Sequence, residues 1–360
     1  MADLADPKYH GFDIIHTSYK HVGDHSIRTD ILVPQTPHSG KRPTIVRFHG
    51  GGLILGDSLY PGFWSQWLSD LALRHNAVII SPNYRLLPQA TGLDIYNDIE
   101  DFWTWLKSPT SPIHGLLAAH SNPTELDLSR ILLAGESAGG LLSINTALGH
   151  APDVRAATAL YPCVDLSLSS ADFSKPRPDS LLPFGQRTPV SVVEEYLASL
   201  DTNKPVSSTD TPSYVPLMLA VIEHGIIGEW YTRGLDKVSS EAGRVLFPIQ
   251  RLDDPGVTIP RGGITIVQGR QDSVVPPHHS VPFVERAREV ASSTSGAQAG
   301  AGKTGMSAAG GEMANSQQNG KVALVFRDGE HGFDAEERYE DGGWVKEALG
   351  AAVEAWLEVY

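Results

Sequence analysis

The 360-residue sequence has little cysteine, no long apolar run and no excess of positive charge. Its single cysteine, Cys163, excludes an internal disulfide and a zinc site built from several cysteines. No apolar run approaches the roughly 20 residues that a membrane-spanning helix needs. Lys and Arg number 28 against 42 Asp and Glu, a formal net charge of −14, and we find no local basic patch. Partners such as nucleic acid or a membrane are therefore not expected.

The amino-terminal residues lack the basic and then apolar regions of a secretory signal. Hydrophobic residues make up 41% of the chain and charged residues 19%, which is typical of a globular protein. Four histidines gather near the start, but a hairpin there would scatter them, so no metal site is expected: His10, His16, His21 and His25. We expect a cytoplasmic protein, and the sequence does not indicate its oligomeric state.

Strand and helix patterns alternate along the chain after an opening hairpin. The hairpin covers 12–19 and 26–33. Buried strands are expected at 44–48, 77–81, 131–134, 156–160, 264–267 and 322–326, and helices at 63–74, 95–106, 138–148 and 344–356. This order predicts an α/β fold, with a mostly parallel central sheet, helices on both faces and an antiparallel edge.

Two stretches interrupt the alternation. Residues 165–260 separate two strands, are too long for a connection and contain helical patterns at 190–200 and 216–230. We interpret 165–260 as a cap inserted over the carboxyl edge of the sheet, so that 1–164 and 261–360 form the catalytic domain. Residues 292–320 are rich in Gly, Ala, Ser, Gln and Asn, which predicts a disordered surface loop within that domain.

The strongest local motif runs from Gly135 to Gly140 and reads Gly-Glu-Ser-Ala-Gly-Gly. It follows a buried strand and opens a helix, the context that a nucleophile elbow requires. Ser137 would occupy a strained turn that projects its hydroxyl from the sheet. The alternative is a glycine-rich strand-to-helix turn without chemistry.

A second motif, His49-Gly50-Gly51-Gly52, follows the expected strand at 44–48. Consecutive glycines leave backbone N–H groups unshielded, and such donors stabilise the oxyanion of a tetrahedral intermediate. With the N–H of Ala138, Gly51 and Gly52 would form a three-donor hole. A flexible turn and a phosphate loop are the alternatives, but no glycine-rich phosphate-binding pattern or lysine follows.

A serine hydroxyl needs a general base, and the base needs an orienting carboxylate. Asp272 follows the expected strand at 264–267, and His331 follows the strand at 322–326. Both would project from the sheet edge that carries Ser137. His278 and His279 are rival bases, but they lie close behind Asp272 and begin a helical pattern.

Taken together, His-Gly-Gly-Gly, Gly-Glu-Ser-Ala-Gly-Gly, Asp272 and the His331-Gly-Phe segment resemble the hormone-sensitive-lipase family of α/β-hydrolase esterases. The segment from Asn83 to Pro88, which contains Tyr-Arg-Leu, adds to the resemblance. The resemblance implies that Ser137 is the nucleophile, His331 the base and Asp272 its orienting acid. It also implies oxyanion donors at Gly51, Gly52 and Ala138, and no cofactor. His49, Tyr84 and Tyr161 are candidates for substrate contact, with packing as the alternative for both tyrosines.

The sequence departs from that family at three places. Glu136 precedes the nucleophile where the family often has Asp, Gln89 replaces a glutamate, and Asp272 is followed by Ser273 instead of proline. The segment before the first strand is short, so part of the usual cap is expected to be missing and the pocket to be more open.

The main hypothesis is a serine carboxylesterase that cleaves small-molecule esters of short to medium acyl chain through an acyl-enzyme. The same triad also serves acyltransferases, enzymes that cleave thioesters or lactones, and biosynthetic dehydratases or cyclases. A non-catalytic ligand receptor on the same scaffold is a third hypothesis. His331 disfavours it, because plant gibberellin receptors that resemble this family have lost the catalytic histidine.

Overall fold

A computed structural model of the chain describes residues 5–296, 317–319 and 321–359. The strands of these residues form one sheet in the order β1-β2-β4-β3-β5-β6-β7-β9-β8. Their bounds are β1 (Phe12–Val22), β2 (His25–Pro34), β3 (Lys41–Phe48), β4 (Val78–Pro82), β5 (Glu125–Gly135), β6 (Ala156–Leu160), β7 (Ile264–Gly269), β8 (Gln317–Asn319) and β9 (Val322–Arg327). The neighbours from β4 to β9 pair in parallel, whereas the pairs β1–β2, β2–β4 and β8–β9 are antiparallel.

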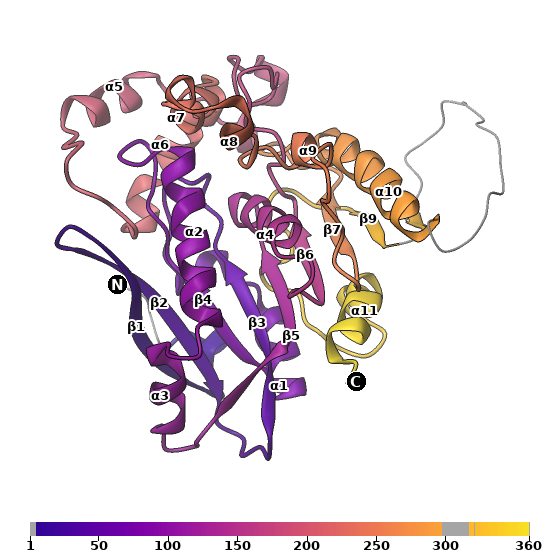
Figure 1. Cartoon of the computed structure of the whole chain (residues 1–360). Helices are drawn as coiled ribbons and strands as arrows, with labels where there is room; N and C mark the ends of the chain where they lie inside the picture. The colour runs from indigo at the N-terminus through magenta and orange to yellow at the C-terminus, as the bar shows by residue number, and fades with distance from the viewer. Residues whose placement is uncertain (1–4, 297–316, 320, 360) are drawn as a thin grey trace.

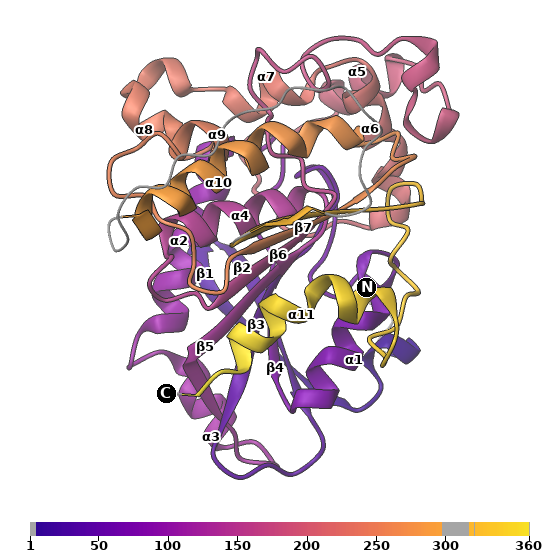
Figure 2. The ribbon, with the colours of Figure 1, turned by 90° about the vertical axis from the view of Figure 1, so that its right-hand side faces the viewer.

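Helices cover both faces of the sheet (Figures 1 and 2). On one face α1 (Gln66–His75) and α11 (Trp344–Leu357) share a core that contains Leu68 and Leu349. On the other face α2 (Gly92–Lys107), α4 (Ala138–Gly149) and α10 (Val281–Gly296) share a core that contains Phe102, Leu141 and Phe283. This arrangement confirms the predicted α/β-hydrolase fold. One short helix that the sequence analysis missed, α3 (Pro112–Ala118), packs near β5.

The long helix α2 shows why these segments are helical. Thr91 caps its start by accepting a hydrogen bond from the N–H of Asp94 at 3.2 Å, and the Asp94 carboxylate accepts the N–H of Thr91 at 2.9 Å. Ile95, Ile99 and Phe102 recur every three or four residues and are buried. The local pattern and the tertiary burial therefore favour the same structure.

Residues 165–260 lie mostly beyond the carboxyl ends of the parallel strands, at the top of Figure 1, and their last part returns to the amino ends, where Thr258 and Ile259 lie near Arg155 and Lys321. They contain α5 (Ser191–Ala198), α6 (Thr211–Glu223), α7 (Ile227–Thr232), α8 (Ser240–Arg244) and α9 (Pro248–Arg251). The helical pattern expected at 216–230 is two helices, because Gly225 breaks it with a φ of +69°. A Cβ at Gly225 would lie 2.4 Å from the backbone of Lys175, so the chain turns there on a residue without a side chain.

The stretch 292–320 differs from the expected loop at both of its ends. Helix α10 continues to Gly296, and β8 extends the sheet by pairing with β9. The remaining residues of this stretch, 297–316 and 320, lie outside the described part of the chain.

The described residues before β1 lie against α1 and against the segment between β3 and α1. The Tyr9 hydroxyl donates to the carbonyl of Leu59 at 2.7 Å, and the Ser69 hydroxyl donates to the carbonyl of Lys8 at 2.6 Å. Across residues 5–296, 317–319 and 321–359, no helix combines the length and the hydropathy that crossing a membrane requires.

Candidate active site

Ser137 lies at the sharp turn between β5 and α4. Its φ of 56° and ψ of −119° are a strained combination for a residue with a side chain, and its N–H donates to the carbonyl of Leu160 at 2.9 Å. A Cβ at Gly135 would lie 2.1 Å from the carbonyl oxygen of Gly139, and one at Gly139 would lie 2.0 Å from that of Phe48. The flanking glycines are therefore required by close packing, and the turn has the form of a nucleophile elbow.

The glycine loop after β3 lies beside this elbow. A Cβ at Gly50 would be 3.4 Å from the Cβ of Ser137. Gly51 and Gly52 have φ values of 105° and 62°, which favour glycine. Among the turn, loop and cap hydrogen bonds of the described residues, none uses the N–H of Gly51, Gly52 or Ala138 as donor. These three amides are thus available to an oxyanion.

Asp272 and His331 meet at the same edge of the sheet. Nδ1 of His331 lies 2.9 Å from Oδ2 of Asp272, and the Asp272 side chain is fully buried. The other oxygen, Oδ1, accepts the N–H groups of Val274 at 2.9 Å and Val275 at 2.8 Å. The amide of Gln268 donates to Oδ2 at 3.1 Å. These bonds fix the carboxylate so that it can orient the imidazole.

Tyr161 connects this pair to the elbow. It directly follows Leu160, whose carbonyl holds the N–H of Ser137, and its ring centroid lies 4.4 Å from that of His331. In the described part of the chain the Ser137 hydroxyl and the His331 imidazole are not joined by a hydrogen bond. Such contacts often tighten only when substrate is bound.

The rival histidines are placed differently. His279 is buried, its Nδ1 lies 3.1 Å from Oδ2 of Asp172, and its Nε2 accepts the N–H of Asp165 at 3.1 Å. Both ring nitrogens are therefore occupied in tying residues 165–172 to the sheet. The His278 side chain is 70% exposed and also faces Asp172. The geometry favours His331 over either residue as the base.

His49 and Tyr84 lie beneath the glycine loop. Their rings stack with centroids 4.3 Å apart, and the Tyr84 hydroxyl donates to the carbonyl of His49 at 2.6 Å. Burial lowers the pKa of His49 to about 4, so the imidazole is neutral at pH 7. Both side chains are fully buried, which favours a role in holding the loop over contact with substrate.

A buried ion pair supports the elbow from below. Glu136, the residue before the nucleophile, pairs with Arg47, and its Oε1 also accepts the N–H of Gly50 at 3.2 Å. Arg47 further donates to the carbonyls of Ser58 at 3.0 Å and Phe63 at 2.9 Å. Burial raises the pKa of Glu136 to about 7, although Arg47 acts in the opposite direction. Sequence reasoning missed this pair, because its members are 89 positions apart.

Another buried carboxylate, Asp334, lies three residues after His331. It accepts hydrogen bonds from the hydroxyls of Ser65 at 2.6 Å and Tyr161 at 2.5 Å and from the indole of Trp67 at 2.8 Å. The Tyr161 side chain is thereby anchored where its ring contacts His331. The sequence signal for Asp334 is its position directly after the His-Gly-Phe motif.

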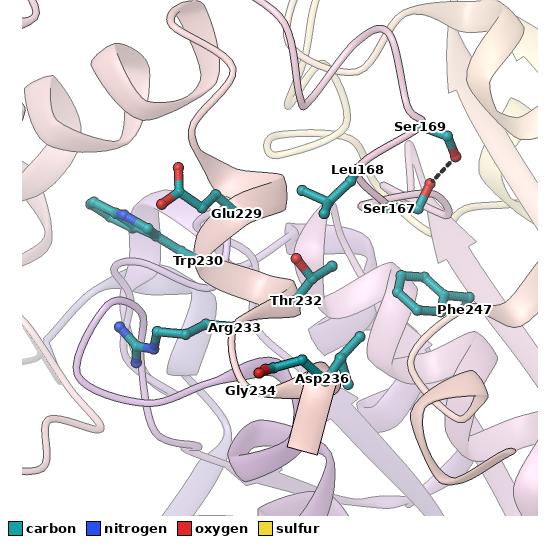
Figure 3. Close-up of a pocket in the computed structure, with 11 residues that line it drawn as sticks. Ser167, Leu168, Ser169, Glu229, Trp230, Thr232, Arg233, Gly234, Asp236 and Phe247 are labelled. Atoms are coloured by element: carbon teal, nitrogen blue, oxygen red, sulfur yellow. Dashed lines mark hydrogen bonds between the residues drawn. The ribbon is translucent and has the colours of Figure 1, made fainter. Parts of the chain in front are cut away.

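A cavity of about 790 Å³ lies within residues 165–260, away from these groups (Figure 3). Its lining residues come from 167–169, α7, the turn that follows α7, and Phe247. Ser137, Asp272 and His331 are not among them. The cavity is therefore separate from the chemistry described above.

Comparisons with known proteins identify the family and the fold. Residues 45–240 match a family described by the α/β-hydrolase fold. A protein from a Phoma species named "Probable carboxylesterase M8" is 32% identical over 287 residues, which cover 77% of this chain and 84% of that relative. "Probable carboxylesterase clz11" of Cochliobolus lunatus is 36% identical over 121 residues, and the match spans about half of its length, 53%.

Two solved esterases share the fold. The structure of a Rhizomucor miehei esterase has a TM-score of 0.57 at 15% identity and covers 99% of this chain and 87% of that one. A thermostable esterase from Pseudomonas putida has a TM-score of 0.55 at 16% identity, with 98% and 85% covered. The chain belongs to the α/β-hydrolase family, and its resemblance to the hormone-sensitive-lipase type is confirmed.

Proposed function

We propose that the protein is a serine carboxylesterase with Ser137 as nucleophile, His331 as base and Asp272 as the acid that orients the base. The observation that carries the proposal is the 2.9 Å hydrogen bond between Asp272 and His331 at the sheet edge that holds the strained Ser137 turn. The names of the carboxylesterase relatives support the same reaction class.

In the proposed reaction the Ser137 oxygen attacks the ester carbonyl while His331 takes its proton. The negative charge that develops on the carbonyl oxygen is stabilised by the N–H groups of Gly51, Gly52 and Ala138. His331 then protonates the leaving alcohol, and an acyl-enzyme remains. Water, activated by His331, releases the acid and restores the serine. Asp272 holds the imidazole in the required tautomer throughout.

Residues 165–260 are proposed as the cap that limits the acyl pocket. Support comes from Met218 of α6, because a Cβ at Gly52 would lie only 3.1 Å from its Cγ. This contact restricts the space beside the proposed oxyanion donors, consistent with a short to medium acyl chain. A cytoplasmic location is part of the proposal, and fractionation of expressing cells tests it.

Hydrolysis of a p-nitrophenyl ester series from acetate to palmitate tests both the reaction and the acyl preference. We expect maximal turnover between acetate and octanoate, and Ser137→Ala should lower turnover by about 10⁴- to 10⁶-fold. Ser293→Ala is the matched control, since Ser293 is exposed near the end of α10.

A fluorophosphonate should label the wild-type protein and the Ser293 variant with one equivalent, and should not label Ser137→Ala. Undiminished hydrolysis by Ser137→Ala would refute the assignment of the nucleophile. A maximum at palmitate would refute the restricted acyl pocket but not the reaction.

A further inference from the structure

The pairing of β7 with β9 continues beyond the ends of both strands. The regular register ends at Gly269 and Arg327. Past that point the N–H of Arg270 donates to the carbonyl of Arg327 at 2.7 Å, and the N–H of Gln271 donates to that of Gly329 at 3.2 Å. The side-chain oxygen of Gln271 then accepts the N–H of Gly329 at 2.6 Å. A side chain thus replaces a main-chain acceptor just before Asp272.

The next link is made by the side chain of Glu330. Its Oε1 accepts two backbone N–H groups, that of Ser273 at 2.6 Å and that of His331 at 2.8 Å. One carboxylate oxygen therefore joins the residue after Asp272 to the base itself. The hydroxyl of Ser273 is engaged elsewhere, since it accepts the N–H of Phe184 at 2.7 Å.

We propose that Glu330 is a positioning residue whose carboxylate sets the distance between the Asp272 and His331 loops. The inference rests on the proposed function, because it concerns the same acid and base. Glu330 acts through the backbone of its neighbours and leaves the substrate to Ser137 and the oxyanion donors.

The chemistry of the contact explains why this residue has that role. Hydrogen bonds from N–H groups to a carboxylate are about twice as strong as those to a neutral acceptor. Across the described ranges, no ion pair to a basic side chain diverts the Glu330 carboxylate. Without it, the amides of Ser273 and His331 lose their shared acceptor, and the loops are free to separate. A misplacement of about 1 Å can lower turnover by about 10²-fold.

Replacing the carboxylate in two steps tests the proposal. Glu330→Gln keeps a side-chain oxygen that can accept both N–H groups, whereas Glu330→Ala removes the acceptor. We expect Glu330→Ala to lower kcat by about 10- to 100-fold with little change in KM, and Glu330→Gln to recover most of that loss. Glu354→Ala, which changes an exposed glutamate of α11, should match the wild-type protein.

A second pair of variants probes the other end of the bond. Proline has no N–H, so Ser273→Pro removes the donor, while Ser273→Ala removes only the hydroxyl. We expect kcat of Ser273→Pro to lie at least about tenfold below that of Ser273→Ala. In the Glu330→Ala background the two Ser273 variants should differ much less, because the bond is already absent.

Thermal unfolding identifies variants that fail to fold. If Glu330→Ala does not fold, the comparison of kcat between Ser273→Pro and Ser273→Ala tests the proposal instead. Wild-type kcat in a folded Glu330→Ala would overturn the proposal, as would equal losses in Glu330→Gln and Glu330→Ala. Neither result would affect the esterase assignment, which fails separately if Ser137→Ala stays active.

Discussion

Arg47→Met is the perturbation that most directly tests the buried pair beneath the elbow. Arg47 is fully buried, donates to two backbone carbonyls and neutralises Glu136, and its guanidinium lies 4.6 Å from the ring centroid of Trp64. Methionine fills a similar volume but leaves Glu136 with Gly50 as its remaining hydrogen-bond donor. Removing one partner of a buried ion pair costs about 3–5 kcal/mol of unfolding free energy.

The pKa of Glu136 determines how this loss of unfolding free energy changes with pH. Burial raises that pKa from 4.5 to about 7. The folded wild-type protein therefore binds this proton more tightly than the unfolded chain, and its contribution to stability falls as pH rises from about 4.5 to about 7. Without Arg47 the pKa rises further, so in the variant the fall continues beyond pH 7.

Urea unfolding followed by tryptophan fluorescence at pH 6 and pH 8 measures the effect. One pH unit is worth about 1.4 kcal/mol, and the wild-type protein already loses about that much between pH 6 and pH 8. The variant's loss should therefore be larger at pH 8 than at pH 6 by up to about 1.4 kcal/mol. Adding Glu136→Gln should remove the extra pH dependence and recover part of the stability. Equal losses at both pH values, with no recovery in the double variant, would refute the reasoning.

Three other properties follow from groups near the site. Gly139→Ala should be inactive in the ester assay or unfolded by circular dichroism, because the new Cβ would lie 2.0 Å from the carbonyl oxygen of Phe48. Its control, Gly115→Ala, places a Cβ in open space within α3 and should raise the unfolding free energy by about 0.5–1 kcal/mol. Burial raises the pKa of Cys163 to about 12, so a thiol reagent at pH 8 should label it only in urea. Asp334→Asn places an amide group opposite hydrogen-bond donors, so it should lower the unfolding free energy in urea by about 1–3 kcal/mol. It should also lower kcat, because the Tyr161 ring beside His331 loses its anchor. An unchanged kcat would exclude this link from Asp334 through Tyr161 to His331.

Much of the fold could be predicted because local and tertiary preferences coincide. The strand pattern at 156–160 is β6 itself, and the helix expected at 344–356 differs from α11 by one residue. The motifs around Ser137 and His331 were informative because a catalytic serine and histidine of this fold are expected at the ends of strands, and these residues follow β5 and β9.

What escaped prediction depends on partners distant in sequence. The break at Gly225 has a local signal, a glycine with a φ of +69° just after α6, but the close approach of the Lys175 backbone to that glycine does not. Asp334 lies in a loop, and its three hydrogen-bond donors are distant in sequence. Trp67 lies in α1, Ser65 lies immediately before α1, and Tyr161 immediately follows β6. Glu330 likewise gains its importance only when the loop at Ser273 lies beside it.

Residues 165–260, the proposed cap, also contact the segments that carry the proposed site residues. Arg177 donates to the carbonyls of Ser273 at 2.5 Å and Val274 at 2.7 Å, directly after the proposed acid. Thr209 and Gly56 exchange hydrogen bonds of 3.1 and 3.0 Å beside the glycine loop. The proposed acid follows β7 and the glycine loop follows β3, yet the segments beside both are hydrogen-bonded to residues 165–260. A displacement of residues 165–260 as one body would break these hydrogen bonds, and would therefore disturb the surroundings of the proposed acid and of the proposed oxyanion donors together.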